Sequence, residues 1–168
     1  MSKYIDSLLK ISLSSLVFTA SMFTTSATIS ATETSITKIA QVKPSTATTN
    51  SVGGPLAKEL QGKPVIVDVF ATWCSGCKNI APTLSQLKQE YSGKVNFVVL
   101  DVTDKAKLKQ TETMAKKLGL GKFLKANKSK TSTVAIIDPS TGNILAIYQN
   151  NANKADYTKI LKTALAKK

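Results

Sequence analysis

Apolar residues from Pro55 to the C-terminus recur in the short runs that are typical of β-strands. The run from Val65 to Phe70 is rich in β-branched residues and predicts a central strand buried on both faces. By the same pattern, further strands are predicted at residues 95–102, 133–137 and 143–148, and the strand at 95–102 is also expected to be buried. The sequence Asp-Pro-Ser-Thr-Gly at 138–142 predicts a turn that joins the last two strands into a hairpin.

Apolar residues at helical spacing predict helices around these strands. They are expected near residues 56–60, after Cys77 as far as residues 91–93, from a cap at Asp104 to Leu118, and at 155–166. The lysine-rich segment 121–130 is expected to be irregular. From the first strand on, the order strand-helix-strand-helix-strand-strand-helix predicts an α/β fold, with a mixed sheet of four to five strands flanked by helices.

The first 54 residues differ in composition from the rest of the chain. Residues 1–31 combine N-terminal lysines with an uncharged apolar stretch and small residues, a pattern typical of a cleaved export signal peptide. A retained N-terminal membrane anchor is the alternative, because no charge occurs between Lys10 and Glu33. Residues 32–54 are rich in Thr and Ser and are expected to form a flexible linker to a domain at 55–168. Both alternatives predict an extracytoplasmic domain.

The net charge is strongly positive, with 23 basic and 10 acidic residues and a formal charge of +13. Every basic residue is a lysine. Proteins that read nucleic acids rely on arginine for bidentate contacts, so nucleic-acid binding is not expected. The lysines are scattered along the sequence, which favours a solvated surface; attraction to acidic partners or anionic lipid headgroups is the alternative.

The motif Cys74-Ser75-Gly76-Cys77 lies where the first strand gives way to a helix. Free backbone N–H groups and the helix dipole favour a thiolate at the first turn, so Cys74 is expected to be the nucleophile. Cys77 could then reach back and displace a mixed disulfide. A zinc site is the alternative use of two cysteines, but the chain has no histidine and no third cysteine with which to complete a tetrahedral site.

The segment from Val67 to Pro82 resembles the active-site pattern of the thioredoxin superfamily almost position by position. The resemblance extends from about Leu56 to the C-terminus. It implies a thioredoxin-like fold, with Cys74 as the attacking thiol and Cys77 as the resolving thiol.

The same resemblance implies roles for three neighbours of the cysteines. Trp73 would be the flanking aromatic residue that contacts substrate, Asp68 the buried carboxylate for proton transfer, and Pro82 the cause of a helix kink. A packing role for Trp73 and a purely structural role for Asp68 are the alternatives. The family's lysine beside that carboxylate aligns with Val99, so burial is expected to raise the pKa of Asp68.

The sequence departs from this family just before the third strand. Thr131-Ser132-Thr133 aligns with a loop in which the family has a cis-proline followed by threonine, and Ser132 takes the place of the proline. That loop pairs with the substrate backbone in the family, so all three residues are expected to bind substrate. A cis bond without proline costs about 3 kcal/mol, so a trans bond and an altered groove are expected. The altered loop leaves room for a metal cluster or copper at the cysteines.

Segment 121–130 precedes this loop and is longer than in the minimal family member. We expect it to shape the choice of partner, with Phe123 and Leu124 as contacts. A plain surface loop is the alternative.

Together these features predict a thiol-disulfide oxidoreductase that reduces or exchanges disulfides in extracytoplasmic proteins. The sequence has no nucleotide or flavin motif, so no cofactor is expected and a membrane partner would supply electrons. A monomer is expected, associated with the membrane if the N-terminal segment is retained. A disulfide-introducing oxidant, a metal- or cluster-binding carrier, and a module with a merely structural disulfide are the alternatives.

Overall fold

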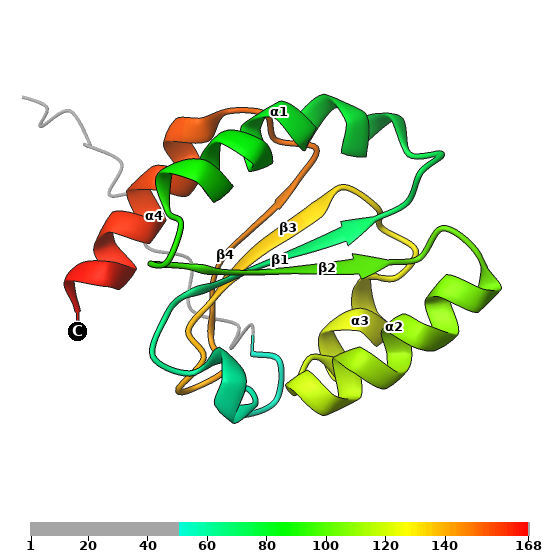
Figure 1. Cartoon of the computed structure of the whole chain (residues 1–168), viewed down its shortest axis with the longest axis horizontal. Coiled ribbons are helices and arrows are strands. Elements are labelled where there is room, and N and C mark those ends of the chain that lie inside the picture. Colours follow the sequence, from blue (N-terminus) through cyan, green and yellow to red (C-terminus); the bar gives the residue numbers. More distant parts are fainter. Residues whose placement is uncertain (1–50, 168) are drawn as a thin grey trace, which may run out of the picture. The chain divides into compact units, whose positions relative to one another are not determined.

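The computed structural model describes residues 51–167, which form a mixed four-stranded sheet with helices on both faces (Figure 1). The strands are β1 (Val65–Phe70), β2 (Asn96–Asp101), β3 (Thr133–Ile137) and β4 (Ile144–Gln149), in the spatial order β2-β1-β3-β4. Strand β1 pairs parallel with β2 and antiparallel with β3, and β3 pairs antiparallel with β4. The predicted α/β architecture is confirmed, with four strands among the described residues. The expected signal segment 1–31 and most of the expected linker lie outside them.

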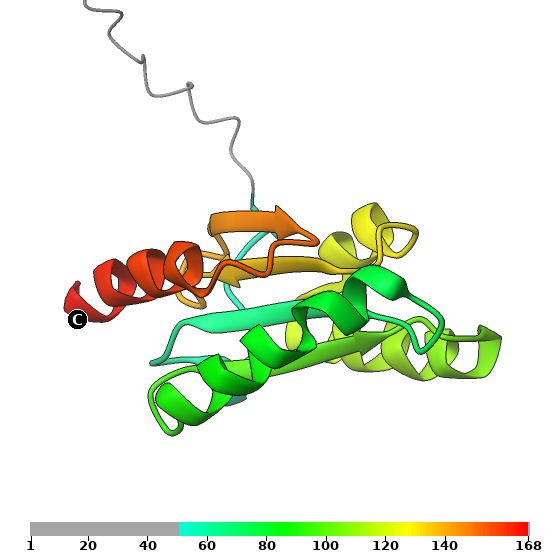
Figure 2. The ribbon, with the colours of Figure 1, turned by 90° about the horizontal axis from the view of Figure 1, so that it is seen from above.

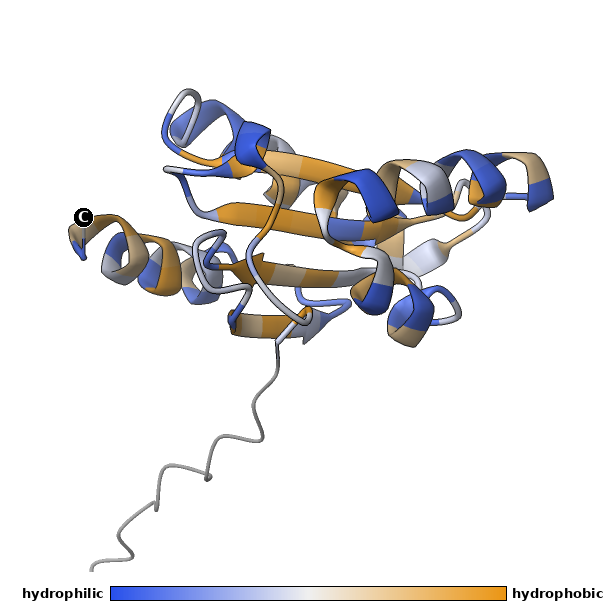
Figure 3. Cartoon of the chain, turned by 90° about the horizontal axis from the view of Figure 1, so that it is seen from below, coloured by the Kyte–Doolittle hydropathy of each residue, from blue (hydrophilic) through white to orange (hydrophobic). Residues whose placement is uncertain are grey.

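Helices cover the sheet in two pairs (Figures 1 and 2). They are α1 (Ser75–Glu90), α2 (Lys105–Leu118), α3 (Gly121–Asn127) and α4 (Lys154–Ala166), and a 3-10 turn η1 (Lys58–Leu60) precedes β1. Helices α1 and α4 pack on the face that carries Ile66, and α2 and α3 pack on the face that carries Val67 and Val69. In Figure 3 the strands are mostly hydrophobic, whereas hydrophilic residues gather on the helices. Within residues 51–167, none of the helices has the length and apolar character needed to span a bilayer.

The two strands predicted to be buried differ in their surroundings. Strand β1 is central and its residues Val65 to Val69 are all buried. Strand β2 lies at the edge of the sheet, and its residue Val99 is 52% exposed. The expectation of a second fully buried strand is therefore wrong, because an apolar run does not reveal whether a strand has neighbours on one side or on two.

Helix α2 has the ends that the sequence predicts. The side chain of Asp104 accepts a hydrogen bond from the backbone N–H of Lys107 at 2.8 Å, which satisfies one of the free donors of the first turn. Gly119 follows the last residue with a φ of 81°, a conformation that glycine adopts without steric cost.

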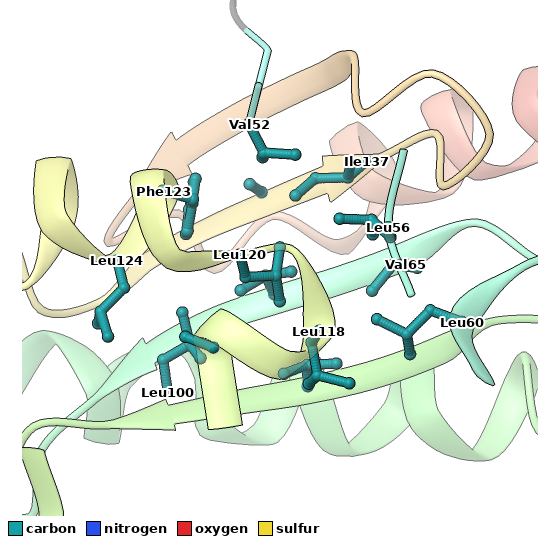
Figure 4. Close-up of a cluster of buried hydrophobic side chains, with 14 of the residues drawn as sticks. Val52, Leu56, Leu60, Val65, Leu100, Leu118, Leu120, Phe123, Leu124 and Ile137 are labelled. Atoms are coloured by element: carbon teal, nitrogen blue, oxygen red, sulfur yellow. The ribbon is translucent and has the colours of Figure 1, made fainter. Parts of the chain in front are cut away.

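The segment predicted to be irregular contains helix α3. Leu120, Phe123 and Leu124 are spaced so that they share one helix face, and all three are buried in the cluster between this helix and the sheet (Figure 4). The expectation that Phe123 and Leu124 contact a partner is wrong, since they are only 3% and 2% exposed. Their lysine neighbours masked an apolar face that is about one helical turn long.

The fold begins before the expected boundary at Pro55. Ser51 forms an isolated antiparallel bridge with Asn143, and the Val52 backbone N–H donates to the Gly142 carbonyl at 2.9 Å. The Val52 side chain is 3% exposed and joins the cluster shown in Figure 4. Residues 51–54, which the sequence placed in the linker, are therefore part of the domain.

Candidate active site

Cys74 and Cys77 form a disulfide at the start of α1, directly after the central strand. Their Cα atoms are 5.3 Å apart, and the two residues are 6% and 2% exposed. Cys74 is the N-cap of α1, and its Sγ accepts a hydrogen bond from the Cys77 backbone N–H at 3.0 Å. In the reduced protein this donor and the helix dipole would stabilise a thiolate on Cys74.

The loop between β1 and α1 fixes the position of this disulfide. The Cys74 backbone N–H donates to the Ala71 carbonyl at 3.2 Å, and Cys77 Sγ lies 3.8 Å from the carbonyl oxygen of Val69. The side chain of Cys77 thus lies against the end of the central strand. Pro82 lies inside α1.

Trp73 stands at the surface beside the disulfide and is 65% exposed. Its indole N–H donates to the carbonyl of Thr103 at 2.8 Å, in the loop between β2 and α2. The Thr72 backbone N–H donates to the Thr103 hydroxyl at 3.1 Å, so the two loops are joined by two hydrogen bonds. A role in core packing does not fit this exposure. The ring is held in place with much of its surface open to solvent.

The loop before β3 has the trans geometry that the sequence predicts. The described residues contain no cis peptide bond, and Ser132 has a φ of 61°. Its N–H donates to the Val69 carbonyl at 2.9 Å, and its carbonyl accepts from the Asn150 N–H at 2.9 Å. Ser132 is therefore tied on one side to the strand before the disulfide and on the other to the end of β4.

An open groove of about 560 Å³ lies over the disulfide. It is lined by Trp73, Cys74, Ser75, Gly76, Thr131, Ser132, Gln149 and Asn150. The structure thus brings Trp73, Cys74, Thr131 and Ser132 together, as the sequence predicts. Thr133 does not line the groove; it is 3% exposed and is paired with β1 and β4 on its two sides.

Asn150 is a groove residue that sequence reasoning missed. It has a φ of 51°, and its Oδ1 accepts a hydrogen bond from Asn79 Nδ2 of α1 at 3.0 Å. The hairpin register pairs Thr133 with Gln149, which sets the next residue beside Ser132. The hairpin turn alone would not have revealed this neighbour, because the register shifts by one residue between Ile136 and Ile137.

Asp68 lies beneath the site in the centre of β1 and is 8% exposed. Its register partners are Val99 and Val134, so no charged residue lies opposite it on the neighbouring strands. Its Oδ1 has no hydrogen-bond partner within residues 51–167. Burial raises the pKa of this carboxyl from 3.8 to about 6, in the direction the sequence predicts.

A metal centre would need more donors than these cysteines. Among residues 51–167, no group of three or more His, Cys, Asp or Glu side chains is arranged to hold a metal ion. The chemistry that the described residues support on their own is dithiol-disulfide exchange.

Comparison with known proteins places these features in a family. The sequence model of the Thioredoxin family matches residues 48–135, slightly more than half of the chain. A thiol:disulfide interchange protein (TxlA homolog) of Synechocystis sp. is 47% identical over 49 residues, 29% of this chain and 27% of that protein. A chloroplastic M-type thioredoxin of Spinacia oleracea is 37% identical over 78 residues, 46% of this chain and 42% of that protein. The chain thus spans less than half the length of these curated relatives.

Solved structures with a similar backbone include a thioredoxin family thiol:disulfide interchange protein from Chlorobium tepidum. It is 28% identical with a TM-score of 0.44, over 64% of this chain and 83% of that one. A thioredoxin of Fasciola hepatica is 24% identical with a TM-score of 0.44, over 63% of this chain and 85% of that one.

Proposed function

Since this chain belongs to the thioredoxin family, we propose that it is a thiol-disulfide oxidoreductase that reduces or exchanges disulfides in extracytoplasmic proteins. The observation that carries the proposal is the Cys74–Cys77 disulfide at the N-terminus of α1, beneath an open groove. Cys74 lines this groove, whereas Cys77 lies one helical turn further on and does not line it. A target disulfide can therefore reach one sulfur and not the other.

The reaction begins from the reduced dithiol. The Cys74 thiolate attacks one sulfur of the target disulfide, which forms a mixed disulfide and releases the first target thiolate. The Cys77 thiol then loses its proton and attacks Cys74 Sγ, which releases the second target thiolate and forms the Cys74–Cys77 disulfide. Two electrons pass to the target, and the two released thiolates take up protons. A dithiol protein partner must then reduce the enzyme for the next cycle.

We infer that Asp68 accepts the proton of Cys77. It precedes Val69, whose carbonyl oxygen is 3.8 Å from Cys77 Sγ, and it lies on the sheet face that α1 covers. A carboxyl with a pKa of about 6 can take a proton from a thiol and return it to solvent near neutral pH. Its unpartnered Oδ1 is a free acceptor for that proton.

The cellular setting follows from the N-terminal sequence. The apolar, Ser/Thr-rich segment at residues 1–31 supports export, so the domain works outside the cytoplasm, in a periplasm or equivalent compartment. An oxidising compartment would keep the disulfide closed unless a partner reduced it. A membrane protein with a dithiol is the class of donor that can carry electrons to that side.

The test is the reduction potential of the Cys74–Cys77 pair, measured in dithiothreitol or glutathione redox buffers. A value below about −230 mV supports a reductase, whereas a value near about −120 mV moves the assignment to a disulfide-introducing oxidant. A pair that does not titrate at all would exclude both enzymatic functions.

A trapping experiment tests the roles of the two sulfurs. We expect Cys77→Ser to accumulate a mixed disulfide with a disulfide-bonded protein substrate, because the resolving thiol is missing. Cys74→Ser is the matched control and should trap nothing, since the remaining thiol does not line the groove. Equal trapping by the two variants would contradict the assignment of Cys74 as the nucleophile.

A further inference from the structure

The positive charge of the domain is concentrated on helices α2 and α3. Residues 51–167 contain 18 lysines, and nine of them fall between residues 104 and 130, a segment with only two acidic residues. The nine are Lys105, Lys107, Lys109, Lys116, Lys117, Lys122, Lys125, Lys128 and Lys130, and all are exposed. We call them the lysine face. The sequence suggested scattered lysines, but half of the 18 lie on α2, on α3 or just after α3, and these two helices pack on the same face of the sheet (Figure 1).

Few of these charges are neutralised by the protein itself. Lys117 pairs with Glu59 at 3.3 Å and Lys128 with Glu112 at 3.6 Å. The other seven form no ion pair within residues 51–167. Asp104 caps the backbone of α2 through the N–H of Lys107. The lysine face therefore projects a positive potential into solvent.

Both ends of the lysine face border the groove over the disulfide. Helix α2 begins two residues after Thr103, whose carbonyl accepts the indole N–H of Trp73. At the other end, Lys130 directly precedes Thr131, which lines the groove. Figures 1 and 2 show the start of α1 and the start of α2 at the same end of the sheet. A partner held by the lysines would lie beside the disulfide.

We propose that the lysine face steers acidic protein partners onto the disulfide, so that this protein prefers targets with Asp or Glu residues around their own cysteines. The inference rests on the proposed function and names its partner class. Long-range attraction raises the rate of encounter by about 10- to 1,000-fold and weakens as salt is added. It acts before any contact forms, so the sulfur chemistry is the same for every target.

An anionic bilayer fits the lysine face less well. Helices that bind bilayers combine basic residues with exposed Trp, Phe or Leu side chains that enter the acyl region. Here Leu118, Phe123 and Leu124 are buried in the core of the domain (Figure 4). Met114, at 36% exposure, is the one large apolar side chain that α2 and α3 expose.

The test compares two triple variants of the full chain that lose the same charge. Lys105→Gln/Lys125→Gln/Lys130→Gln removes three lysines of the lysine face that form no ion pair within residues 51–167. The control, Lys63→Gln/Lys88→Gln/Lys94→Gln, removes three exposed lysines at the opposite end of the sheet. Each reduced protein reacts by stopped flow with two disulfide-bonded peptides, flanked by glutamates or by lysines, at about 20 mM and about 500 mM NaCl.

We expect the lysine-face variant to react about tenfold more slowly than wild type with the glutamate peptide at low salt. The difference should vanish at high salt, and the control should stay within about twofold of wild type. The lysine peptide should not be slowed. The reduction potential and the rate with dithiothreitol should be equal in all three proteins, because neither involves the lysine face.

Three outcomes would overturn the proposal. Equal slowing of both variants would show an effect of net charge alone. Equal rates with both peptides would show no steering. An unchanged peptide rate combined with reduced sedimentation on phosphatidylglycerol vesicles, relative to the control, would assign the lysine face to anionic lipid. A wild-type protein that reacts with neither peptide nor dithiothreitol would instead exclude the proposed function, and the steering with it.

Discussion

Gly76 and Ser132 approach each other so closely across the groove that a Cβ atom on Gly76 would lie 2.7 Å from Ser132 Oγ and 3.0 Å from Ser132 Cβ. Gly76 lies in the first turn of α1, and its φ is not in the left-handed region. Space, and not backbone conformation, therefore requires glycine at this position. Gly76, between the two cysteines, and Ser132, in the proline's place, therefore leave no room for a larger residue at position 76.

Gly76→Ala should accordingly lower the free energy of unfolding, although alanine favours helices by about 1 kcal/mol. We expect a net loss of about 1–2 kcal/mol, because Ser132 must move away from the new methyl group. In a Ser132→Gly background the same change should be neutral or stabilising. Urea unfolding of the oxidised single and double variants would give the coupling energy, and additive effects would contradict the contact.

Replacing Ser132 by the family's proline should be strongly destabilising. The Ser132 N–H donates to Val69 at 2.9 Å, and proline has no such donor. Proline also fixes φ near −65°, whereas Ser132 has a φ of 61°. We expect Ser132→Pro to lose about 3 kcal/mol or more in urea unfolding.

Ser132→Gly is the matched control for that change. Glycine keeps the N–H and adopts a positive φ without strain, so we expect a gain of about 1 kcal/mol. A proline variant as stable as wild type would mean that the loop accepts the family's cis geometry, and the altered groove would then not depend on this residue.

Elements defined by short-range pattern could be predicted from the sequence. Strands β1 and β3 have the predicted bounds, because their apolar runs end at turn residues or at a change of polarity. Helix α2 has its predicted ends, because Asp104 and Gly119 act on the turns next to them. The placement of the cysteines at the start of α1 also follows from local order.

Features that depend on neighbours distant in the sequence could not be predicted in the same way. The exposure of Val99 depends on β2 having a partner on one side only. Burial of Val52 depends on a bridge to a residue 92 positions away from Ser51. The β3–β4 register places Asn150 at the groove, and no residue type in the sequence indicates that register. Helix α3 is different, since its apolar spacing was present in the sequence but lay among lysines.

The backbone of Asn150 gives a prediction that separates conformation from hydrogen bonding. Asn150 has a φ of 51°, and the steric cost of this backbone conformation is smaller for asparagine than for alanine. We expect Asn150→Ala to lose about 1–2 kcal/mol in urea unfolding.

Two control variants separate the causes of that loss. Asn150→Gly should lose less than Asn150→Ala, because glycine accepts the backbone but not the bond to Asn79. Asn79→Ala removes that exposed hydrogen bond alone and should lose about 0.5 kcal/mol. Equal losses in Asn150→Ala and Asn150→Gly would contradict a conformational cost.

Burial of Asp68 makes the stability of the protein depend on pH. Its carboxyl has a pKa of about 6 in the fold against 3.8 ordinarily, so the folded protein binds this proton more tightly than the unfolded chain. The stabilisation is present in full below about pH 4 and is lost as pH rises through 6. At about 1.4 kcal/mol per pKa unit, the loss approaches about 3 kcal/mol by pH 8. Asparagine does not ionise at this position, so the free energy of unfolding of Asp68→Asn should not show this fall with rising pH.

Denaturant unfolding between pH 2 and pH 8 tests this expectation. The stability of Asp68→Asn relative to wild type should rise with pH, so the variant gains most above pH 6. Asp138→Asn is a control of opposite sign, because the Ser140 hydroxyl lowers the pKa of that carboxyl. Its contribution to stability is present near neutrality and is lost on acidification, so the cost of Asp138→Asn should shrink as pH falls. Parallel pH curves for Asp68→Asn and wild type would mean that the buried carboxyl is not the group that titrates.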